Sequence, residues 1–179
     1  MQKLTRRHVI ATITTSSVLL CPAILNAQVT LDLDWDGIPT DTPVGQDRLI
    51  TVPAGPAQVD VSDLQPGEVA VIARPSEDEK YSSTGMTQYV AVHRRTDAQI
   101  AAADGAAYFV ADLVCTHRGK AIGLTGNLDS PFACTDRRGR HGSVYDSTGL
   151  GVAGASEGER MSIPEHTLST GDQVVLSLA

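Results

Sequence analysis

The sequence predicts a mainly β fold, and three features indicate it. Short runs rich in Val, Ile and Tyr recur in the C-terminal two thirds, turn signals built from Pro, Gly and Asp separate them, and only one short segment has a helical pattern. The chain has 179 residues, 41% hydrophobic and 20% charged, which suits one ordinary domain with a short extension. This composition lies outside the disordered class, so a packed core is expected.

The first 27 residues are interpreted as an export segment. Lys3, Arg6 and Arg7 precede an apolar stretch without acidic residues, and the adjacent arginines have the form of a twin-arginine signal; an ordinary secretory leader is the alternative. The stretch approaches the ~20 residues that span a bilayer, but its Thr and Ser residues and Pro22 make it a marginal span. Both a cleaved leader and a membrane anchor are consistent with it. Either places the domain on the periplasmic side of a bacterial inner membrane, anchored or released.

Residues 28–58 are interpreted as a linker and 59–179 as the folded domain, because prolines punctuate the former and it has no sustained period. One short helix is expected from Thr96, which can cap it with Gln99 as its capping-box partner, to an end at Asp104 and Gly105. Strands are expected at 59–61, 69–73, 88–93, 107–110 and 174–178.

The charge distribution indicates which kinds of macromolecule the protein could bind. Beyond the export segment the chain carries 11 basic against 21 acidic side chains, a formal charge of −10. Binding to a nucleic-acid phosphate backbone requires a basic face, so nucleic acid is not expected as a partner. A cationic protein surface suits this charge better.

Side chains capable of metal or redox chemistry concentrate between residues 115 and 145. Cys115 and His117 are two residues apart, so in extended backbone they point the same way; Cys134 and His141 form a second group. Glycines crowd around both groups and give tight loops conformational freedom. Two structural alternatives follow from these residue types: a Cys115–Cys134 disulfide, the default for an exported protein, and a zinc ion held by the two cysteines and two histidines.

These two loops resemble those of the Rieske iron–sulfur proteins, in particular the Rieske subunit of proteobacterial cytochrome bc complexes, the quinol–cytochrome c reductases. The matching residues are Val114-Cys115-Thr116-His117-Arg118-Gly119 and Cys134 followed by His141-Gly142-Ser143-Val144-Tyr145-Asp146. Looser matches at Pro66-Gly67, Arg94-Arg95-Thr96 and Ile163-Pro164 extend the resemblance over most of 59–179. It implies a Rieske-type antiparallel β-sandwich with a small cluster-binding subdomain at about 113–157.

The resemblance also implies one [2Fe–2S] cluster per chain, with Cys115 and Cys134 on one iron and His117 and His141 on the other. Such a mixed ligand set is neutral when oxidised, which raises the reduction potential from about −400 mV to roughly −150 to +300 mV. Ser143 and Tyr145 match positions whose hydroxyls hydrogen-bond cluster sulfur, so the high end of that range is expected. The family uses the exposed histidine of the second loop, here His141, to meet quinol.

The implied function is electron transfer from quinol to a c-type cytochrome, as a subunit of a cytochrome bc-type complex with cytochrome b and a c-type cytochrome as partners. The subunit alone performs no bond chemistry, since the enzyme is the complex. Two alternatives are the Rieske small subunit of a periplasmic molybdenum oxidase similar to arsenite oxidase and a stand-alone periplasmic carrier. An alternative of another class is a non-redox β binding domain held by a Cys115–Cys134 disulfide.

The sequence departs from the family pattern in three places. Six residues separate Cys134 from His141, where the family has two. The disulfide that ties the two loops together is missing, with Lys120 at the first of its positions and Asp136 or Arg140 at the second. The proline-rich loop that shields the cluster corresponds to 154–158, which contains no proline. These departures predict a looser and wetter cluster.

Overall fold

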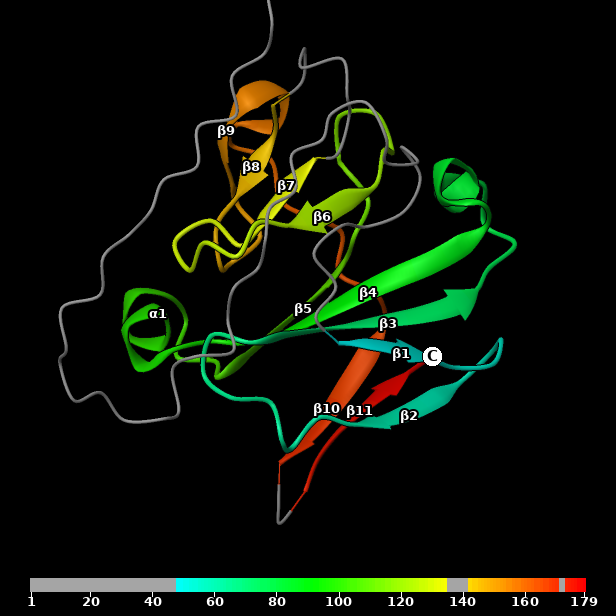
Figure 1. Ribbon diagram of the computed structural model, residues 1–179, viewed down its shortest axis with the longest axis horizontal. Helices are drawn as coiled ribbons and strands as arrows, with labels where there is room; N and C mark the ends of the chain where they lie inside the picture. Colours follow the sequence, from blue (N-terminus) through cyan, green and yellow to red (C-terminus); the bar gives the residue numbers. More distant parts are fainter. Residues whose placement is uncertain (1–47, 135–141, 171–172) are drawn as a thin grey trace, which may run out of the picture.

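The structure is a computed structural model that describes residues 48–134, 142–170 and 173–179 (Figure 1). The expected mainly β class is confirmed. The elements in chain order are β1 Leu49–Thr51, β2 Ala57–Asp60, β3 Val69–Pro75, the 3₁₀ helix η1 Glu79–Thr84, β4 Thr87–Arg94, α1 Asp97–Ala102, β5 Tyr108–Asp112, β6 Ile122–Leu124, β7 Phe132–Cys134, β8 Val144–Tyr145, β9 Gly151–Ala153, the 3₁₀ helix η2 Gly154–Ser156, β10 His166–Thr170 and β11 Val174–Leu178.

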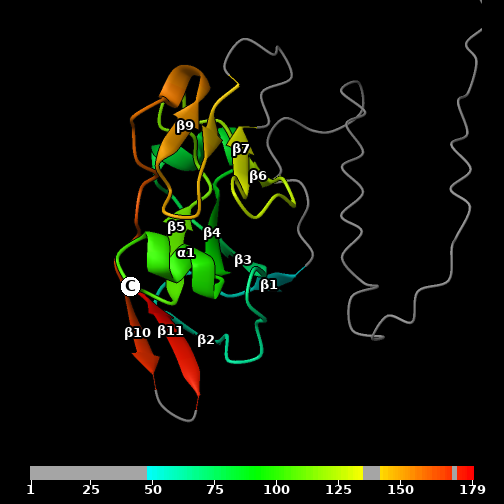
Figure 2. The ribbon, with the colours of Figure 1, turned by 90° about the vertical axis from the view of Figure 1, so that its left-hand side faces the viewer.

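The strands form three sheets, with the orders β1-β3-β4-β5, β10-β11-β2 and β6-β7-β8-β9. The first sheet lies between the other two, with β6–β9 on one side and β2, β10 and β11 on the other (Figures 1 and 2). All strand pairs are antiparallel except β1 and β3, which run parallel. Residues 1–27, interpreted above as an export segment, lie outside the described residues. Within the described ranges no helix has the length and apolar character that crossing a membrane requires.

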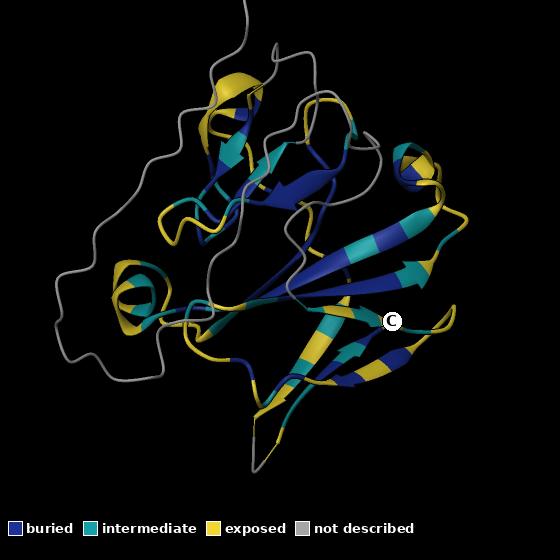
Figure 3. Ribbon diagram, in the orientation of Figure 1, coloured by how far each residue is buried: buried dark blue, intermediate teal, exposed yellow. Residues whose placement is uncertain are grey.

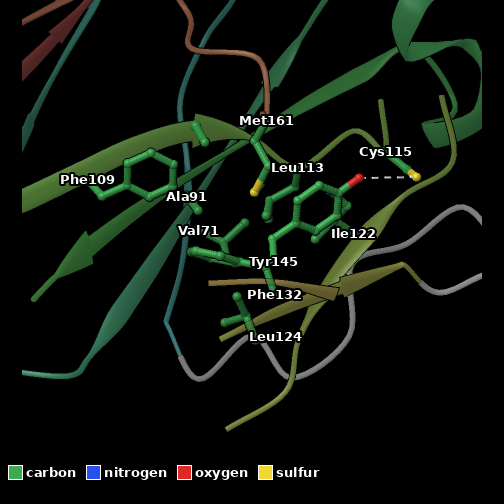
Figure 4. Close-up of a cluster of buried hydrophobic side chains, with 11 residues drawn as sticks. Val71, Ala91, Phe109, Leu113, Cys115, Ile122, Leu124, Phe132, Tyr145 and Met161 are labelled. Carbon is green, nitrogen blue, oxygen red and sulfur yellow. Dashed lines mark hydrogen bonds between the residues drawn. The ribbon is translucent and has the colours of Figure 1, made fainter. Parts of the chain in front are cut away.

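The middle sheet contributes side chains to two hydrophobic cores, one on each face, because successive side chains of a strand point to opposite faces. On β3, Val71 faces β6–β9, whereas Ala70 and Ile72 face the other way. The strands β3, β4 and β5 are buried along most of their length (Figure 3). We call the second core the base core; it contains Val59, Val61, Leu64, Ala70, Ile72, Val90, Val92, Val110, Leu176 and Leu178. The first, the site core, contains Val71, Ala91, Phe109, Ala111, Leu113, Cys115, Ile122, Leu124, Phe132, Tyr145 and Met161 (Figure 4).

The five strands expected from the sequence are present as β2, β3, β4, β5 and β11. The expected helix is α1, and both bonds of the capping box between Thr96 and Gln99 form. It ends one to two residues earlier than expected, with Ala103 rather than Asp104 and Gly105 at its C-terminus. Strand β1 lies within the range 28–58 interpreted as linker, so the end of that range belongs to the middle sheet.

For His93 and His166, two of the histidines outside the cluster loops, the sequence predicts positions at the surface or at strand ends. His166 begins β10, as expected, and its Nδ1 lies 2.8 Å from the carbonyl oxygen of Pro164. His93 also lies at a strand end, next to the last residue of β4, but it is not at the surface, since it has 0% exposure. Its ring packs edge-on against Phe132 at a centroid distance of 6.0 Å. The alternation of β4 turns residue 93 toward the site core together with Ala91, and β7 then covers it.

Candidate metal centre

The sheet β6-β7-β8-β9, which we call the site sheet, brings the end of the first cysteine loop next to the start of the second. The first loop, 115–120, connects Val114 to Ala121, which form an isolated antiparallel bridge. Ile122 follows that loop and is paired with Cys134, from which the second loop departs. Because β6 and β7 are paired and antiparallel, the start of β6 and the end of β7 lie at the same end of the sheet. The first loop therefore ends beside the residue at which the second loop begins.

The second loop is closed at its base. The backbone N–H of Cys134 donates to the carbonyl of Ser143 at 2.9 Å, directly before β8 pairs with β7. His141 and the lengthened segment between the cysteine and this histidine lie outside the described residues, as does Asp136. The described ends of the loop nevertheless show that both the departure at Cys134 and the return at Ser143 are fixed by the strands.

The first loop is a tight turn with external support. Its ends are joined by the N–H of Cys115, which donates to the carbonyl of Lys120 at 2.7 Å, and the N–H of Gly119 donates to the carbonyl of Cys115 at 2.7 Å. Gly119 has φ +62°, a conformation that glycine adopts without the cost of a Cβ. From η1, the Ser83 hydroxyl donates to the Gly119 carbonyl. The loop is thus bound to a neighbouring helix as well as to its own strands.

The two cysteines meet as thiols. Cys115 is 2% exposed and Cys134 is half-buried, and the two side chains are hydrogen-bonded rather than joined in a disulfide. The alternative of a domain stabilised by a Cys115–Cys134 disulfide therefore lacks that bond in this structure. His117 is exposed on the first loop, and its backbone N–H donates to the Cys115 sulfur.

Hydroxyl groups surround the Cys115 sulfur. The Tyr145 phenol, itself fully buried, donates to it at 3.4 Å (Figure 4). The Ser156 hydroxyl lies 3.7 Å from the same sulfur. Thr116 Oγ1 lies 3.2 Å from the Tyr145 oxygen and 3.0 Å from Ser156 Oγ. Ser143, expected beside cluster sulfur, instead donates to Ser156 at 3.1 Å.

These contacts set the acidity of the buried groups. The hydrogen bond from Cys134 is the largest influence on the Cys115 thiol; with the further bonds from Tyr145, the N–H of His117 and Ser156, it outweighs burial and lowers the pKa of Cys115 well below its usual range. Burial is the main cause that raises the pKa of Tyr145, so the phenol keeps its proton and can donate it to sulfur. The site thus favours a thiolate at Cys115.

The structure therefore assembles part of the expected centre. It brings together Cys115, Cys134, Ser143 and Tyr145, and it places His117 on the exposed tip of the first loop. Within the described ranges, no three or more His, Cys, Asp or Glu side chains gather closely enough to hold a metal ion. Sequence reasoning missed Ser156 and Thr116. Ser156 carried no motif signal, and Thr116 was visible only as the residue between two expected ligands.

No model of a known protein family matches the chain, and no curated protein matches it significantly. The chemistry of the donor set is thus the test of whether an iron–sulfur cluster suits the site. Paired thiols, one of them with a lowered pKa and several hydrogen-bond donors around its sulfur, are the ligands that iron–sulfur clusters take. The described half of the site fits such a cluster.

Proposed function

We propose that this chain is an exported electron-transfer protein that binds a Rieske-type [2Fe–2S] cluster. Cys115 and Cys134 would hold one iron, and His117 and His141 the other. The observation that supports this most is the meeting of two thiols from separate loops, with the Tyr145 phenol donating to one of the sulfurs at 3.4 Å. A packed β domain without a metal has little use for a buried thiol supplied with several donors, because an apolar side chain fills the same space without needing partners.

When bound, such a cluster supplies a one-electron carrier whose mixed thiolate and imidazole ligands give it a high reduction potential. The residues of this chain adjust that potential and shield the site from water. Tyr145 and the N–H of His117 donate to the Cys115 sulfur and so stabilise negative charge there, which favours the reduced state. The site core, including Phe132 and Leu113, buries the protein side of Cys115 and excludes water from it.

The exposed loop tips would meet the redox partners. His117 is exposed, and an imidazole at such a tip can exchange a proton with a donor such as a quinol. We propose transfer from quinol to a c-type cytochrome within a cytochrome bc-type complex, with His141 as the residue that contacts quinol. The Rieske fold, the export segment and the periplasmic location are parts of the same proposal.

A second candidate is the Rieske small subunit of a periplasmic molybdenum enzyme. The feature that favours it is the first loop, which is held by the Ser83 bond to Gly119 and carries Lys120 where the bc-type proteins have a disulfide cysteine. Chromosomal neighbours encoding a cytochrome b or a molybdopterin subunit separate the two candidates.

The proposal is tested on the purified full chain after reduction with dithionite. We expect about two iron atoms per chain and an electron paramagnetic resonance (EPR) signal with the low average g value of histidine-ligated clusters. Zinc, measured in parallel, is expected to be absent. Folded protein with neither iron nor signal would rule out the proposal, and stoichiometric zinc would replace it with a zinc site.

Replacement of the second-loop histidine tests the ligand set. His141→Cys is expected to lower the reduction potential, since a thiolate adds negative charge, and His141→Ser is expected to lose the cluster. His166→Ser is the matched control, because His166 lies on β10, outside the cluster loops, and should keep a wild-type signal. A His141→Ser protein with an unchanged spectrum would exclude His141 as a ligand.

A further inference from the structure

One serine in the turn after β9 is turned inward. Ser156 has 0% exposure, whereas its neighbours Ala155 and Glu157 are exposed. Its hydroxyl contacts both cluster loops: Cys115 Sγ at 3.7 Å and Thr116 Oγ1 at 3.0 Å from the first, and Ser143 Oγ at 3.1 Å from the second. It is therefore a shared hydrogen-bonding partner of the two loops.

The direction of these bonds follows from how many protons a hydroxyl has. A serine hydroxyl donates one hydrogen bond and accepts up to two. Ser143 and Thr116 both donate to Ser156, which fills its two acceptor positions. The single proton of Ser156 is then available for donation to the Cys115 sulfur at 3.7 Å. The same count shows that Ser143 influences this sulfur through Ser156 rather than directly.

The backbone holds Ser156 in this position. Gly151 in β9 packs so closely against it that a Cβ on Gly151 would lie 1.9 Å from the carbonyl oxygen of Ser156. The N–H of Glu159 donates to that same carbonyl at 3.0 Å, and the N–H of Gly151 donates to the carbonyl of Glu159 at 2.7 Å. The short helix η2 is thus locked against β9, and its last residue points into the site.

We propose that Ser156 is a hydrogen-bond donor to the Cys115 ligand sulfur and that it raises the reduction potential of the centre together with Tyr145. The inference rests on the proposed function, because it concerns the cluster that Cys115 would bind. Hydrogen bonds to a ligand sulfur stabilise the added negative charge of the reduced state, so each donor removed lowers the potential. Ser156 belongs to the segment 154–158, so this turn supplies a tuning residue where the resemblance leads one to expect only shielding.

The test is the midpoint potential of the purified full chain, measured by protein-film voltammetry and EPR-monitored titration. Ser156→Ala is expected to keep the signal and to lower the midpoint potential relative to wild type. Ser156→Thr, which retains a hydroxyl, is expected to restore most of the difference. Ser147→Ala is the matched control. Ser147 is also buried, but it accepts a hydrogen bond from Arg95 through its backbone carbonyl, which the substitution keeps, so the Ser147→Ala protein should have the wild-type midpoint potential.

Because Ser143 is argued to act on the Cys115 sulfur through Ser156, a double-variant comparison of midpoint potentials gives a second test. Ser143→Ala is expected to lower the potential less than Ser156→Ala, and to have no additional effect in a Ser156→Ala background. If Ser156→Ala fails to retain iron, Ser156→Thr must still retain it with a potential near that of wild type; loss of the cluster in both variants would contradict the proposal.

The outcomes separate the inference from the proposed function. Absence of iron and signal in the wild-type chain would overturn both. A wild-type cluster whose potential is the same in Ser156→Ala would overturn the inference alone, and the proposed function would stand.

Discussion

The two sides of the middle sheet are built from different residues. The base core consists entirely of Val, Leu, Ile and Ala, among them Ile72, Val90 and Leu176 with 0% exposure. The site core contains three aromatic residues and Cys115, and the buried polar groups His93 and Ser156 adjoin it. Burial of aliphatic surface needs no particular direction, whereas thiols and hydroxyls must be aimed at their partners.

The difference in residue type between the two cores indicates that the base core mainly stabilises the fold, whereas the site core surrounds the reactive groups. Aliphatic side chains of the base core exclude water from β2 and β11 and tolerate replacements of similar volume. On the site side, buried polar groups cost free energy unless they are paired, so their presence needs a positive reason. The hydroxyls around Cys115 have such a reason in the proposed centre, since they donate to a ligand sulfur.

The largest expected effect lies in the base core. Leu176→Ala removes a side chain with 0% exposure from β11, and we expect the free energy of unfolding to fall by about 2–5 kcal/mol. Urea unfolding followed by circular dichroism measures it. Leu128→Ala, at a position 51% exposed, is the control and should change stability by less than about 0.5 kcal/mol. The folded Leu176→Ala protein should keep the wild-type reduction potential; a shifted potential would show that the two sides are not independent.

The same contrast explains what sequence reasoning could find. The strands β3 and β4 were predictable because each is at least seven residues long and contains a run of β-branched and aromatic residues, such as Val71-Ile72 and Tyr89-Val90. The strands of the site sheet, such as β6 and β8, have three and two residues, too few for a period to be detected. Their positions come from pairing across long sequence separations, which a local pattern does not contain.

For the site, the chemistry of the residues was visible but the contacts between them were not. Cys115, Cys134 and Tyr145 stood out by type and spacing, and the structure brings all three together. The role of Ser156 depends on an inward turn in an exposed segment and on its approach to Gly151. Neither of these has a signature in one sequence, because both are properties of the backbone path.

The next largest effect concerns the pH dependence of stability. Burial, aided by the nearby positive charge of Arg95, lowers the pKa of His93 to about 4 from an ordinary value of 6.5. The folded state therefore keeps His93 neutral, while the unfolded chain takes up a proton as the pH falls below 6.5. The stability that this histidine contributes is complete above pH 6.5 and is lost progressively toward pH 4, by about 3 kcal/mol in total.

The measurement is the free energy of unfolding in urea at intervals between pH 4 and pH 8. His93→Leu should flatten the profile in the stated window. The substitution should cost little near pH 8, since among the described residues neither ring nitrogen of His93 has a hydrogen-bond partner that would be lost. Phe109→Leu changes the same core but removes no titratable group, so it should retain the wild-type pH dependence. A His93→Leu profile as steep as that of wild type would assign the dependence to other groups.

The smallest effect tests how the first cluster loop is held. Ser83→Ala removes the hydroxyl that donates from η1 to the Gly119 carbonyl, and we expect a loss of about 0.5–1.5 kcal/mol in the free energy of unfolding. Ser82→Ala is the matched control, because Ser82 is the adjacent, exposed residue of the same helix. Since the bond acts on one loop, the variant should also accelerate hydrogen exchange at the Gly119 amide, which donates to Cys115, more than at amides of the base core. Equal acceleration in both regions would mean that η1 supports the whole domain, and the separation between a structural side and a chemical side would then not extend to this helix.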